Sequence, residues 1–267
     1  MSRPRRRLDV ELVRRGLIVG RDQAKQAVAY RRVTVNGAIA HKAAQLVLPG
    51  DAVEVAGSGM RYVSRGGEKL QSALEFFSLD PMGLRCCDVG ASTGGFTDCL
   101  LQNGATEVVA VDVGRAQIHE RIASDARVHV YERTDIRNFD FDQSAALFDL
   151  VTVDVSFISL TLVMPSVVCL AARGASVVVL VKPQFEVGRR HVARGRGVIR
   201  DPELWQQAID KVLRSAASIN LAPQAAAASV LKGAQGNAEF FLHLIKNGIA
   251  AALDSSQVVA QAVMQAQ

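Results

Sequence analysis

Short apolar segments alternate with stretches of helical pattern from Leu84 onward, and this alternation constrains the fold more than any other feature. The segments are RCCDV, EVVAVDV, RVHVY, FDLVTVD, ASVVVLVK and EFFLHLI. Strands that alternate with helices are typical of a mainly parallel sheet with helices on both faces. The sequence therefore predicts an α/β fold of the Rossmann-like type, with a mainly parallel, doubly wound sheet.

A glycine-rich stretch, DVGASTGGFTDCL, begins within the first of these segments and continues beyond it. In such folds the turn between the first strand and its helix is a ligand-binding position. A pyrophosphate-binding dinucleotide fingerprint is GxGxxG, and Ser92 stands where its second glycine would lie. An NAD-dependent dehydrogenase is therefore disfavoured.

Two carboxylates in the following segments indicate an adenosine ligand. Asp112 lies about 20 residues beyond the glycine loop, where a carboxylate can accept hydrogen bonds from a ribose diol. Asp135 follows the third segment, where it can meet an adenine edge. The predicted cofactor-binding residues are Asp88, Gly90, Ser92, Gly94, Gly95, Phe96, Asp112 and Asp135.

Four polar residues stand at strand ends or helix starts that face one edge of the predicted sheet: Lys69, Asp154, Lys182 and Glu239. Ligand clefts lie at the carboxyl ends of such strands. Lys182 ends a fully apolar segment, and burying a lysine there is costly unless it is paired or functional. A catalytic set and a structural ion pair between Lys182 and Asp154 are both consistent with the pattern.

The first quarter of the chain differs in charge from the rest. Residues 1–64 carry 12 Lys and Arg against 5 Asp and Glu, whereas the remainder has a net charge of −2. Such a basic region indicates a polyanionic partner, although a solvated charged face would look the same. The candidate RNA-binding residues are Arg5, Arg6, Arg7, Arg14, Arg15, Arg21, Lys25, Arg31, Arg32 and Lys42.

This basic region has its own structural signals. An apolar stripe through Leu8, Leu12 and Leu17 predicts one helix, residues 22–29 predict a second, and Asn36-Gly37 predicts a two-residue hairpin turn. The expected organisation is an RNA-binding domain over 1–58, a linker over 59–65, a catalytic domain over 66–250 and a tail over 251–267, either helical or partly disordered.

Two resemblances bring these features together. Residues 8–55, with LDVELVRRGL, RDQAKQAVAYRRVTVNG and LPGDAVEV, resemble the S4 RNA-binding domain. The motifs SRGGEKL, DVSFISL, VKPQFE and the glutamate before FFL resemble the Lys-Asp-Lys-Glu tetrad of the FtsJ-like ribose 2′-O-methyltransferases. The combination resembles the TlyA-type enzymes, which implies S-adenosylmethionine as cofactor and 2′-O-methylation of cytidine in ribosomal RNA of one or both subunits.

The chemistry of methyl transfer to a hydroxyl assigns roles to the tetrad. A ribose hydroxyl is a weak acid and needs a base, and we expect Lys182 to serve, with burial and Lys69 lowering its pKa. Lys69 can alternatively orient the ribose. Asp154 would hold Lys182, and Glu239 would orient Lys69 or the ribose.

Several other functions are disfavoured. No apolar run reaches the roughly 18 to 20 residues that span a bilayer, and the basic start lacks the apolar core of a signal peptide, so we expect a cytoplasmic protein. The cysteines and histidines lack metal-site spacing, so no metal is expected, and all four cysteines are expected to be buried. The alternatives are an S4-type RNA-binding protein with a non-catalytic fold and a membrane-active hemolysin. The Gly/Arg-rich loop after Gly188 can contact RNA through Arg189, Arg190, Arg194 and Arg196 or simply be solvated.

Overall fold

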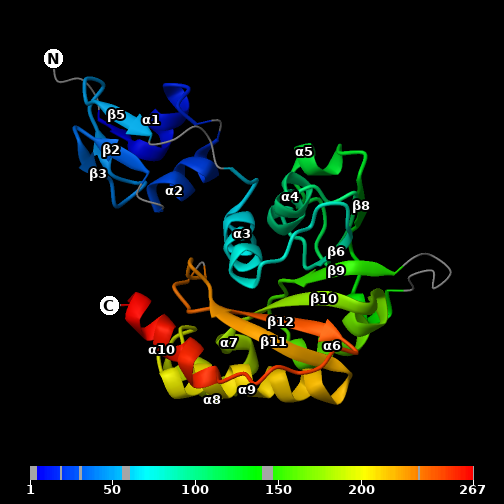
Figure 1. The fold of residues 1–267 in the computed structure, drawn as a ribbon. Helices are drawn as coiled ribbons and strands as arrows, with labels where there is room; N and C mark the ends of the chain where they lie inside the picture. Colours follow the sequence, from blue (N-terminus) through cyan, green and yellow to red (C-terminus); the bar gives the residue numbers. More distant parts are fainter. Residues whose placement is uncertain are drawn as a thin grey trace. The chain divides into compact units, whose positions relative to one another are not determined.

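The computed structural model describes residues 5–18, 20–29, 32–55, 61–139, 147–233 and 235–266. The chain divides into two compact units, residues 1–61 and 62–267 (Figure 1). Each unit has its own buried core.

The amino-terminal unit is a small α+β fold. Its elements are β1 (Arg6–Arg7), α1 (Leu8–Arg14), α2 (Arg21–Ala29), β2 (Val33–Val35), β3 (Ala38–Ile39), β4 (Leu46–Val47) and β5 (Val53–Val55). The strands form an antiparallel sheet in the order β3-β2-β5 and a separate β1-β4 pair. The hairpin prediction is confirmed, because Asn36 and Gly37 both have positive φ, 52° and 79°, as a two-residue turn between β2 and β3 requires.

The predicted apolar stripe of the first helix is only partly correct. Leu8 and Leu12 are buried in the core of this unit, but Leu17 is 41% exposed. The helix ends at Arg14, and Gly16 adopts a φ of 68°, so the chain leaves the helical path before Leu17.

The second unit is built on a seven-stranded sheet in the order β11-β12-β10-β9-β6-β7-β8. The five strands from β10 to β8 are parallel neighbours, and β12 runs antiparallel to both β10 and β11. The strands are β6 (Arg85–Val89), β7 (Glu107–Val111), β8 (Val128–Tyr131), β9 (Phe148–Val153), β10 (Ala171–Val181), β11 (Leu221–Ala228) and β12 (Phe240–Lys246).

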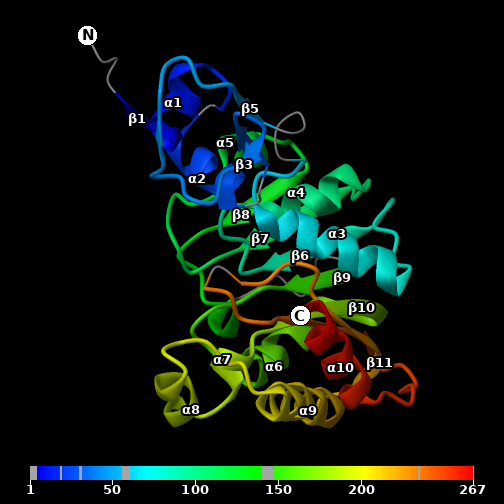
Figure 2. The same ribbon diagram turned by 90° about the vertical axis from the view of Figure 1, so that its left-hand side faces the viewer.

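Helices cover both faces of this sheet, as Figures 1 and 2 show from two directions, and the predicted doubly wound α/β fold is confirmed. They are α3 (Arg65–Phe77), α4 (Gly95–Gln102), α5 (Glu120–Ala123), the 3-10 turn η1 (Ile136–Asn138), α6 (Leu160–Leu170), α7 (Pro183–Glu186), α8 (Arg189–Arg194), α9 (Pro202–Ser218) and α10 (Ser255–Ala266).

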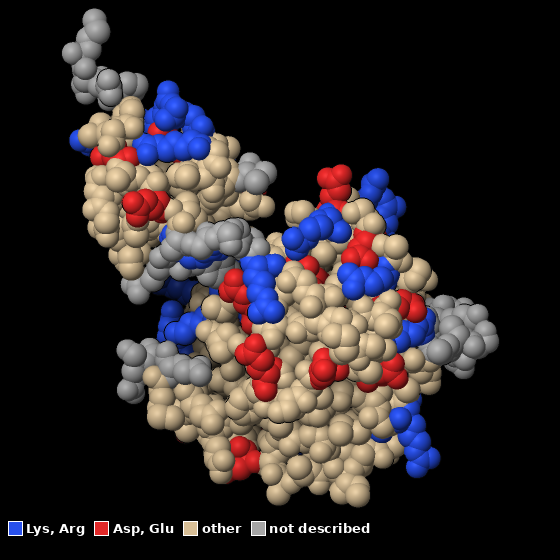
Figure 3. All heavy atoms as spheres, turned by 45° about the horizontal axis from the view of Figure 1, so that its top comes forward, with Lys and Arg blue, Asp and Glu red and all other residues tan. Residues whose placement is uncertain are grey.

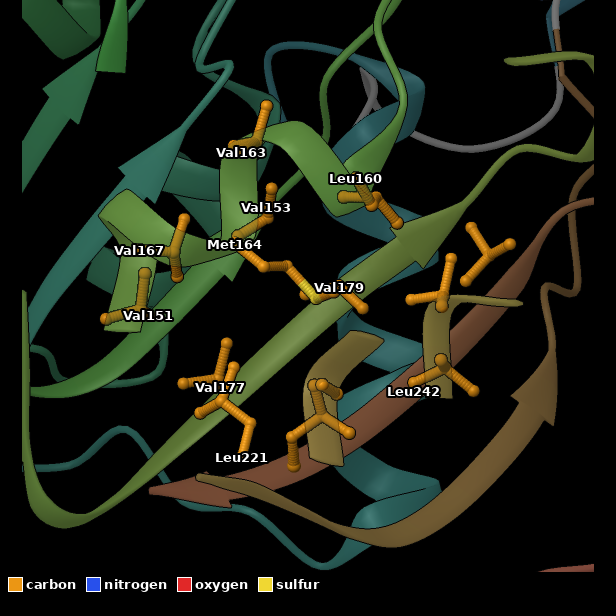
Figure 4. Packing of buried hydrophobic residues seen from close by; sticks show 14 of the residues in the cluster. Val151, Val153, Leu160, Val163, Met164, Val167, Val177, Val179, Leu221 and Leu242 are labelled. Atoms are coloured by element: carbon orange, nitrogen blue, oxygen red, sulfur yellow. The ribbon is translucent and has the colours of Figure 1, made fainter. Parts of the chain in front are cut away.

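Strand periodicity divides the buried side chains between two layers. On β6, Cys86 packs with α3 and α4, whereas the next residue, Cys87, packs on the face that α6, α9 and α10 cover. Side chains on a strand point alternately to opposite faces, so each strand contributes to both layers. Figure 4 shows part of the second layer, where Met164 of α6 packs among valines of β9 and β10.

The tail forms a helix, α10, and its residues Val258, Val259 and Ala262 join the core of the second unit. The expectation that all four cysteines are buried is wrong for Cys169, which lies on an exposed position of α6. Within the described part of the chain, no helix is both long and apolar enough to cross a membrane.

Candidate active site

The glycine loop leaves the carboxyl end of β6 through a turn that only glycine fits. Gly90 has a φ of 85°, and a Cβ at this position would lie 2.4 Å from the carbonyl oxygen of Asp154. L side chains disfavour this backbone conformation, and the close approach leaves no room for one. Gly90 thereby lets the loop after β6 pack directly against the end of β9.

A cavity of about 520 Å³ opens beside this loop, at the carboxyl ends of β6 and β7. Asp112 in its wall accepts hydrogen bonds from the backbone N–H groups of Ser92 (2.7 Å) and Gly114 (2.6 Å). Asp135 caps the start of η1, where its side chain accepts a hydrogen bond from the Arg137 N–H. Hydrogen bonds from the Arg137 guanidinium lower the pKa of the Asp135 carboxyl. Of the predicted cofactor residues, the cavity brings together Gly90, Ser92, Asp112 and Asp135.

The other four predicted cofactor residues do not line this cavity. Asp88 is fully buried within β6, and Phe96 belongs to the core, with its ring 6.1 Å from that of Phe241. Gly94 and Gly95 begin α4, and a Cβ at Gly95 would lie 2.2 Å from the Ser64 hydroxyl oxygen. These residues pack the glycine loop and α4 against the body of the unit.

The four polar residues predicted for catalysis meet at the same edge of the sheet. Asp154 and Lys182 each follow the last residue of the parallel strands β9 and β10. Because β12 runs antiparallel to β10, Glu239, which precedes β12, lies at this edge as well. Lys69 comes from α3.

These residues form two ion pairs. The Lys69 Nζ lies 2.5 Å from the Glu239 Oε2, with the two side chains 10% and 4% exposed. The Lys182 Nζ lies 2.5 Å from the Asp154 Oδ1 and donates a hydrogen bond to the Ser156 hydroxyl at 3.0 Å. Each lysine therefore has its own carboxylate.

A second cavity, of about 790 Å³, is lined by Lys69, Lys182 and Glu239. Gly233 also lines it, and a Cβ there would lie 2.4 Å from the Glu239 Oε1, so a glycine leaves room for that carboxylate. This cavity has lysine, carboxylate and amide groups in its wall and is large enough for a nucleotide-sized ligand.

The two cavities share one wall. Ser156, Phe157 and Ile158 line both of them, while Asp154 lines the first cavity and pairs with Lys182 in the second. The sequence indicated this segment only as part of the motif around Asp154. Its position between the cavities results from the turn after β9, where Phe157 has a φ of 66°.

Glu186 connects the segment after Lys182 to the end of this shared wall. Its carboxylate accepts hydrogen bonds from the Ser159 hydroxyl (2.5 Å), the Leu160 N–H (2.7 Å) and the Lys211 Nζ (3.1 Å). It thereby ties α7, which begins directly after Lys182, to the start of α6. The sequence reasoning missed this residue, although a glutamate within the motif VKPQFE was a signal for it.

In the amino-terminal unit, five of the ten predicted basic residues share two buried carboxylates. Arg7 and Arg21 pair with Asp9 at 3.0 and 3.2 Å. Glu11 pairs with arginines on and beside α1, namely Arg6, Arg14 and Arg15. These arginines, apart from Arg15, keep about half of their side-chain surface exposed.

The remaining members of that set are less organised. Lys25 pairs with Asp22, Arg5 and Lys42 are exposed, Arg32 is half-buried, and Arg31 lies outside the described residues. Lys and Arg side chains form a visible group on this unit in Figure 3. The surface is basic, and its arginines are oriented by the carboxylates beneath them.

Comparison with known proteins relates both units to described families. Residues 62–246 match the FtsJ-like methyltransferase family, and residues 6–53 match the S4 domain. The 16S/23S rRNA (cytidine-2′-O)-methyltransferase TlyA of Mycobacterium tuberculosis is 45% identical over 90% of both chains. Hemolysin A of Brachyspira hyodysenteriae is 34% identical over 90% of this chain and 99% of its own. A solved structure of a Streptococcus thermophilus protein that carries a hemolysin name is 37% identical, covers 99% of this chain and 98% of its own, and superposes with a TM-score of 0.77.

Proposed function

The chain belongs to the FtsJ-like methyltransferases that carry an amino-terminal S4 domain, and we propose that it methylates the ribose 2′-hydroxyl of a cytidine in ribosomal RNA. It is a methyltransferase by family. The proposed substrate is 16S rRNA, 23S rRNA or both, as the name of the Mycobacterium tuberculosis relative specifies for that protein.

The cavity beside the glycine loop fits S-adenosylmethionine, the proposed methyl donor. Its volume of about 520 Å³ lies within the usual range for a small-ligand site. Each carboxylate oxygen of Asp112 accepts one backbone hydrogen bond and retains a second lone pair, so the carboxylate can also accept the two ribose hydroxyls of the donor. Asp135 would accept a hydrogen bond from the adenine amino group. When bound, S-adenosylmethionine supplies a methyl group on a positively charged sulfur.

The cavity with the two ion pairs suits the acceptor ribose. Lys182 would take the proton from the 2′-hydroxyl as the oxygen attacks the methyl group in line. The Lys182 Nζ contacts both Asp154 and Ser156, which keeps it at the wall that the two cavities share. Lys69, held by Glu239, would orient the ribose through hydrogen bonds to its oxygens.

The shared wall is the observation that carries this proposal. A direct transfer needs the donor and the acceptor to meet, and Ser156, Phe157 and Ile158 line both cavities. An S4-type RNA-binding protein without activity would need neither the donor cavity nor the lysine pairs beside it.

One experiment tests both the cofactor and the acceptor. Ribosomal RNA that lacks the modification is incubated with the protein and radiolabelled S-adenosylmethionine, and the methylated nucleotides are mapped. We expect label on a cytidine 2′-oxygen and no label when that nucleotide is 2′-deoxy. Equilibrium binding of NAD but not of S-adenosylmethionine would contradict the cofactor assignment.

The amino-terminal unit is proposed to supply affinity for the RNA. We expect that a chain lacking residues 1–60 binds S-adenosylmethionine as the full chain does but methylates ribosomal RNA poorly, because the net charge of +7 in residues 1–64 is lost almost entirely. Undiminished methylation by the shortened chain would show that the second unit alone recognises the substrate.

A further inference from the structure

The turn after α8 forms a hollow whose charged groups are all arginines. Its volume is about 390 Å³, and it is lined by Arg194, Arg196 and Arg200 together with Gly195 and Val198. All three arginines are exposed. Across the described parts of the chain, none of the three makes an ion pair with a carboxylate, in contrast to the arginines around Asp9 and Glu11. The hollow therefore carries the positive charges of three arginines close together, without any described carboxylate paired to them.

The backbone beneath this hollow is fixed by buried groups. The Asn237 side chain is 1% exposed, accepts a hydrogen bond from the Ile199 N–H and donates one to the Gly197 carbonyl oxygen, both at 2.9 Å. The indole N–H of Trp205 donates to the Ile199 carbonyl oxygen at 2.9 Å. A Cβ at Gly195 would lie 2.1 Å from the Val198 carbonyl oxygen, so the turn is closed tightly. The backbone that carries the three arginines is therefore held in place.

Arg196 occupies a backbone conformation that an arginine disfavours. Its φ is 52°, between Gly195 and Gly197, where a third glycine would adopt the same conformation without strain. Residues held in such conformations cluster at functional sites. Arg196 shares this conformation with other described residues, such as Ser92 and Phe157 at the two cavities, so it supports a functional position for the turn.

The same turn borders the acceptor cavity. Val192, Ala193 and Gly197 line that cavity, and so does Asn237, which stands two residues before Glu239. Arg194 and Arg196, which lie between Ala193 and Gly197 in the chain, line the hollow instead. The hollow and the acceptor cavity therefore lie on the same short turn, within reach of one RNA strand.

We propose that the arginine hollow binds backbone phosphates of the RNA strand next to the nucleotide that is methylated. The planar guanidinium group matches phosphate oxygens with paired hydrogen bonds, and phosphate contacts fix the register of a protein on its nucleic acid. The hollow would set which ribose reaches Lys182. This inference rests on the proposed function, since it takes RNA to be the substrate.

The test compares two double variants of the full chain that remove equal charge. Arg194→Gln with Arg196→Gln removes two of the three arginines of the hollow, whereas Arg173→Gln with Arg214→Gln removes two exposed arginines from β10 and α9. Binding of a fluorescent single-stranded RNA is measured over a series of KCl concentrations. Each lost phosphate contact reduces the slope of log affinity against log salt by about 0.7, so we expect a slope smaller by about 1.4 for the hollow variant and little change for the control. Equal slopes in the two variants would overturn the proposal.

Arg196→Gly separates binding from folding. Glycine adopts the observed φ readily, so the thermal unfolding midpoint should stay the same or rise while RNA affinity falls. Parent-like RNA affinity in this variant would count against the hollow. Methyl transfer by the parent chain is measured in parallel. If the parent binds RNA through the hollow but methylates none, the proposed function alone is refuted. If the parent methylates RNA but the slope of log affinity against log salt is the same with and without the hollow arginines, this inference alone is refuted.

Discussion

The two cavities of the second unit hold their polar groups in different ways. In the donor cavity the carboxylate of Asp112 is fixed by backbone N–H groups of Ser92 and Gly114. In the acceptor cavity side chains hold one another: Lys69 pairs with Glu239, 170 residues away, and Lys182 pairs with Asp154. Backbone groups stay in place when a side chain is replaced, whereas paired side chains depend on each other. The donor side should therefore tolerate substitution better than the acceptor side.

The largest effect is expected at Lys182, where the acceptor side carries the proposed proton transfer. General base catalysis contributes about 10² to 10⁴ in rate, so Lys182→Ala should slow methyl transfer by at least about 10² in single-turnover measurements. Cofactor affinity should change much less than the rate, because Asp112 in the donor cavity is held by backbone N–H groups and not by Lys182. Lys182→Arg should not restore the rate, since a guanidinium group does not deprotonate in proteins. Near-normal transfer by this variant would mean that the lysine acts through charge or position and not as a base.

The buried pair of Lys69 and Glu239 tests whether acceptor groups depend on each other. Glu239→Leu leaves the Lys69 ammonium without its partner, and breaking a buried pair in this way costs about 3 kcal/mol in free energy of unfolding. The double variant Lys69→Met with Glu239→Leu replaces both charges and should recover most of that stability while methyl transfer stays low. Chemical denaturation and transfer assays check both outcomes. A double variant as unstable as Glu239→Leu would show that the pair is not what makes the single change costly.

On the donor side, Asp112→Ala tests the backbone-held carboxylate. The substitution leaves the N–H groups of Ser92 and Gly114 without their acceptor and removes the proposed partner of the ribose, so S-adenosylmethionine affinity should fall by about 1 to 3 kcal/mol. Calorimetry measures this directly, with Lys182→Ala as the matched control in the other cavity. Unchanged affinity for Asp112→Ala would remove Asp112 from the proposed cofactor site.

The difference between groups held by nearby backbone and side chains held by distant side chains also explains what could be predicted from the sequence. The sheet was predictable because strand and helix patterns are local, and parallel neighbours such as β6 and β7 bring Gly90 and Asp112 to one edge. The four tetrad residues could be placed at that edge, but the pairing of Lys69 with Glu239 depends on the packing of α3 and was left open. The spacing of the glycine motif also could not separate residues that line the cavity from Phe96, which packs into the core.

The net charge of the first unit could be read from the sequence, but the positions of its ion pairs could not. The excess of basic residues in the first unit was evident, yet Asp9 and Glu11 are 0% and 1% exposed and neutralise part of it. Their arginine partners lower the pKa of both carboxyls to about 2. Counting charges cannot find such buried partners, because nothing in the spacing of Asp9 and Glu11 distinguishes them from solvated carboxylates.

Asp88 lies beneath the glycine loop, and its side chain accepts hydrogen bonds from the hydroxyls of Thr97 (2.7 Å) and Thr152 (3.2 Å). The carboxylates of Asp154 and Glu239, by contrast, each pair with a lysine. Complete burial raises the pKa of its carboxyl to about 7, far above the ordinary value near 3.9 that applies in the unfolded chain. Between these two values the folded chain holds a proton that the unfolded chain releases, so the contribution of Asp88 to the free energy of unfolding falls as the pH rises from about 4 to about 7.

Asp88→Asn keeps the shape without the charge, and the stability of the variant relative to the parent should increase by up to about 1.4 kcal/mol per pH unit between pH 5 and 7, then level off. Denaturation at pH 5, 6, 7 and 8 measures this difference, and Asp125→Asn serves as the control, because Arg127 lowers the pKa of that carboxyl to about 2 and the difference should stay constant. A constant difference for Asp88→Asn as well would show that the carboxylate is ionised throughout this range and that the donor side holds its buried charge as firmly as the acceptor side.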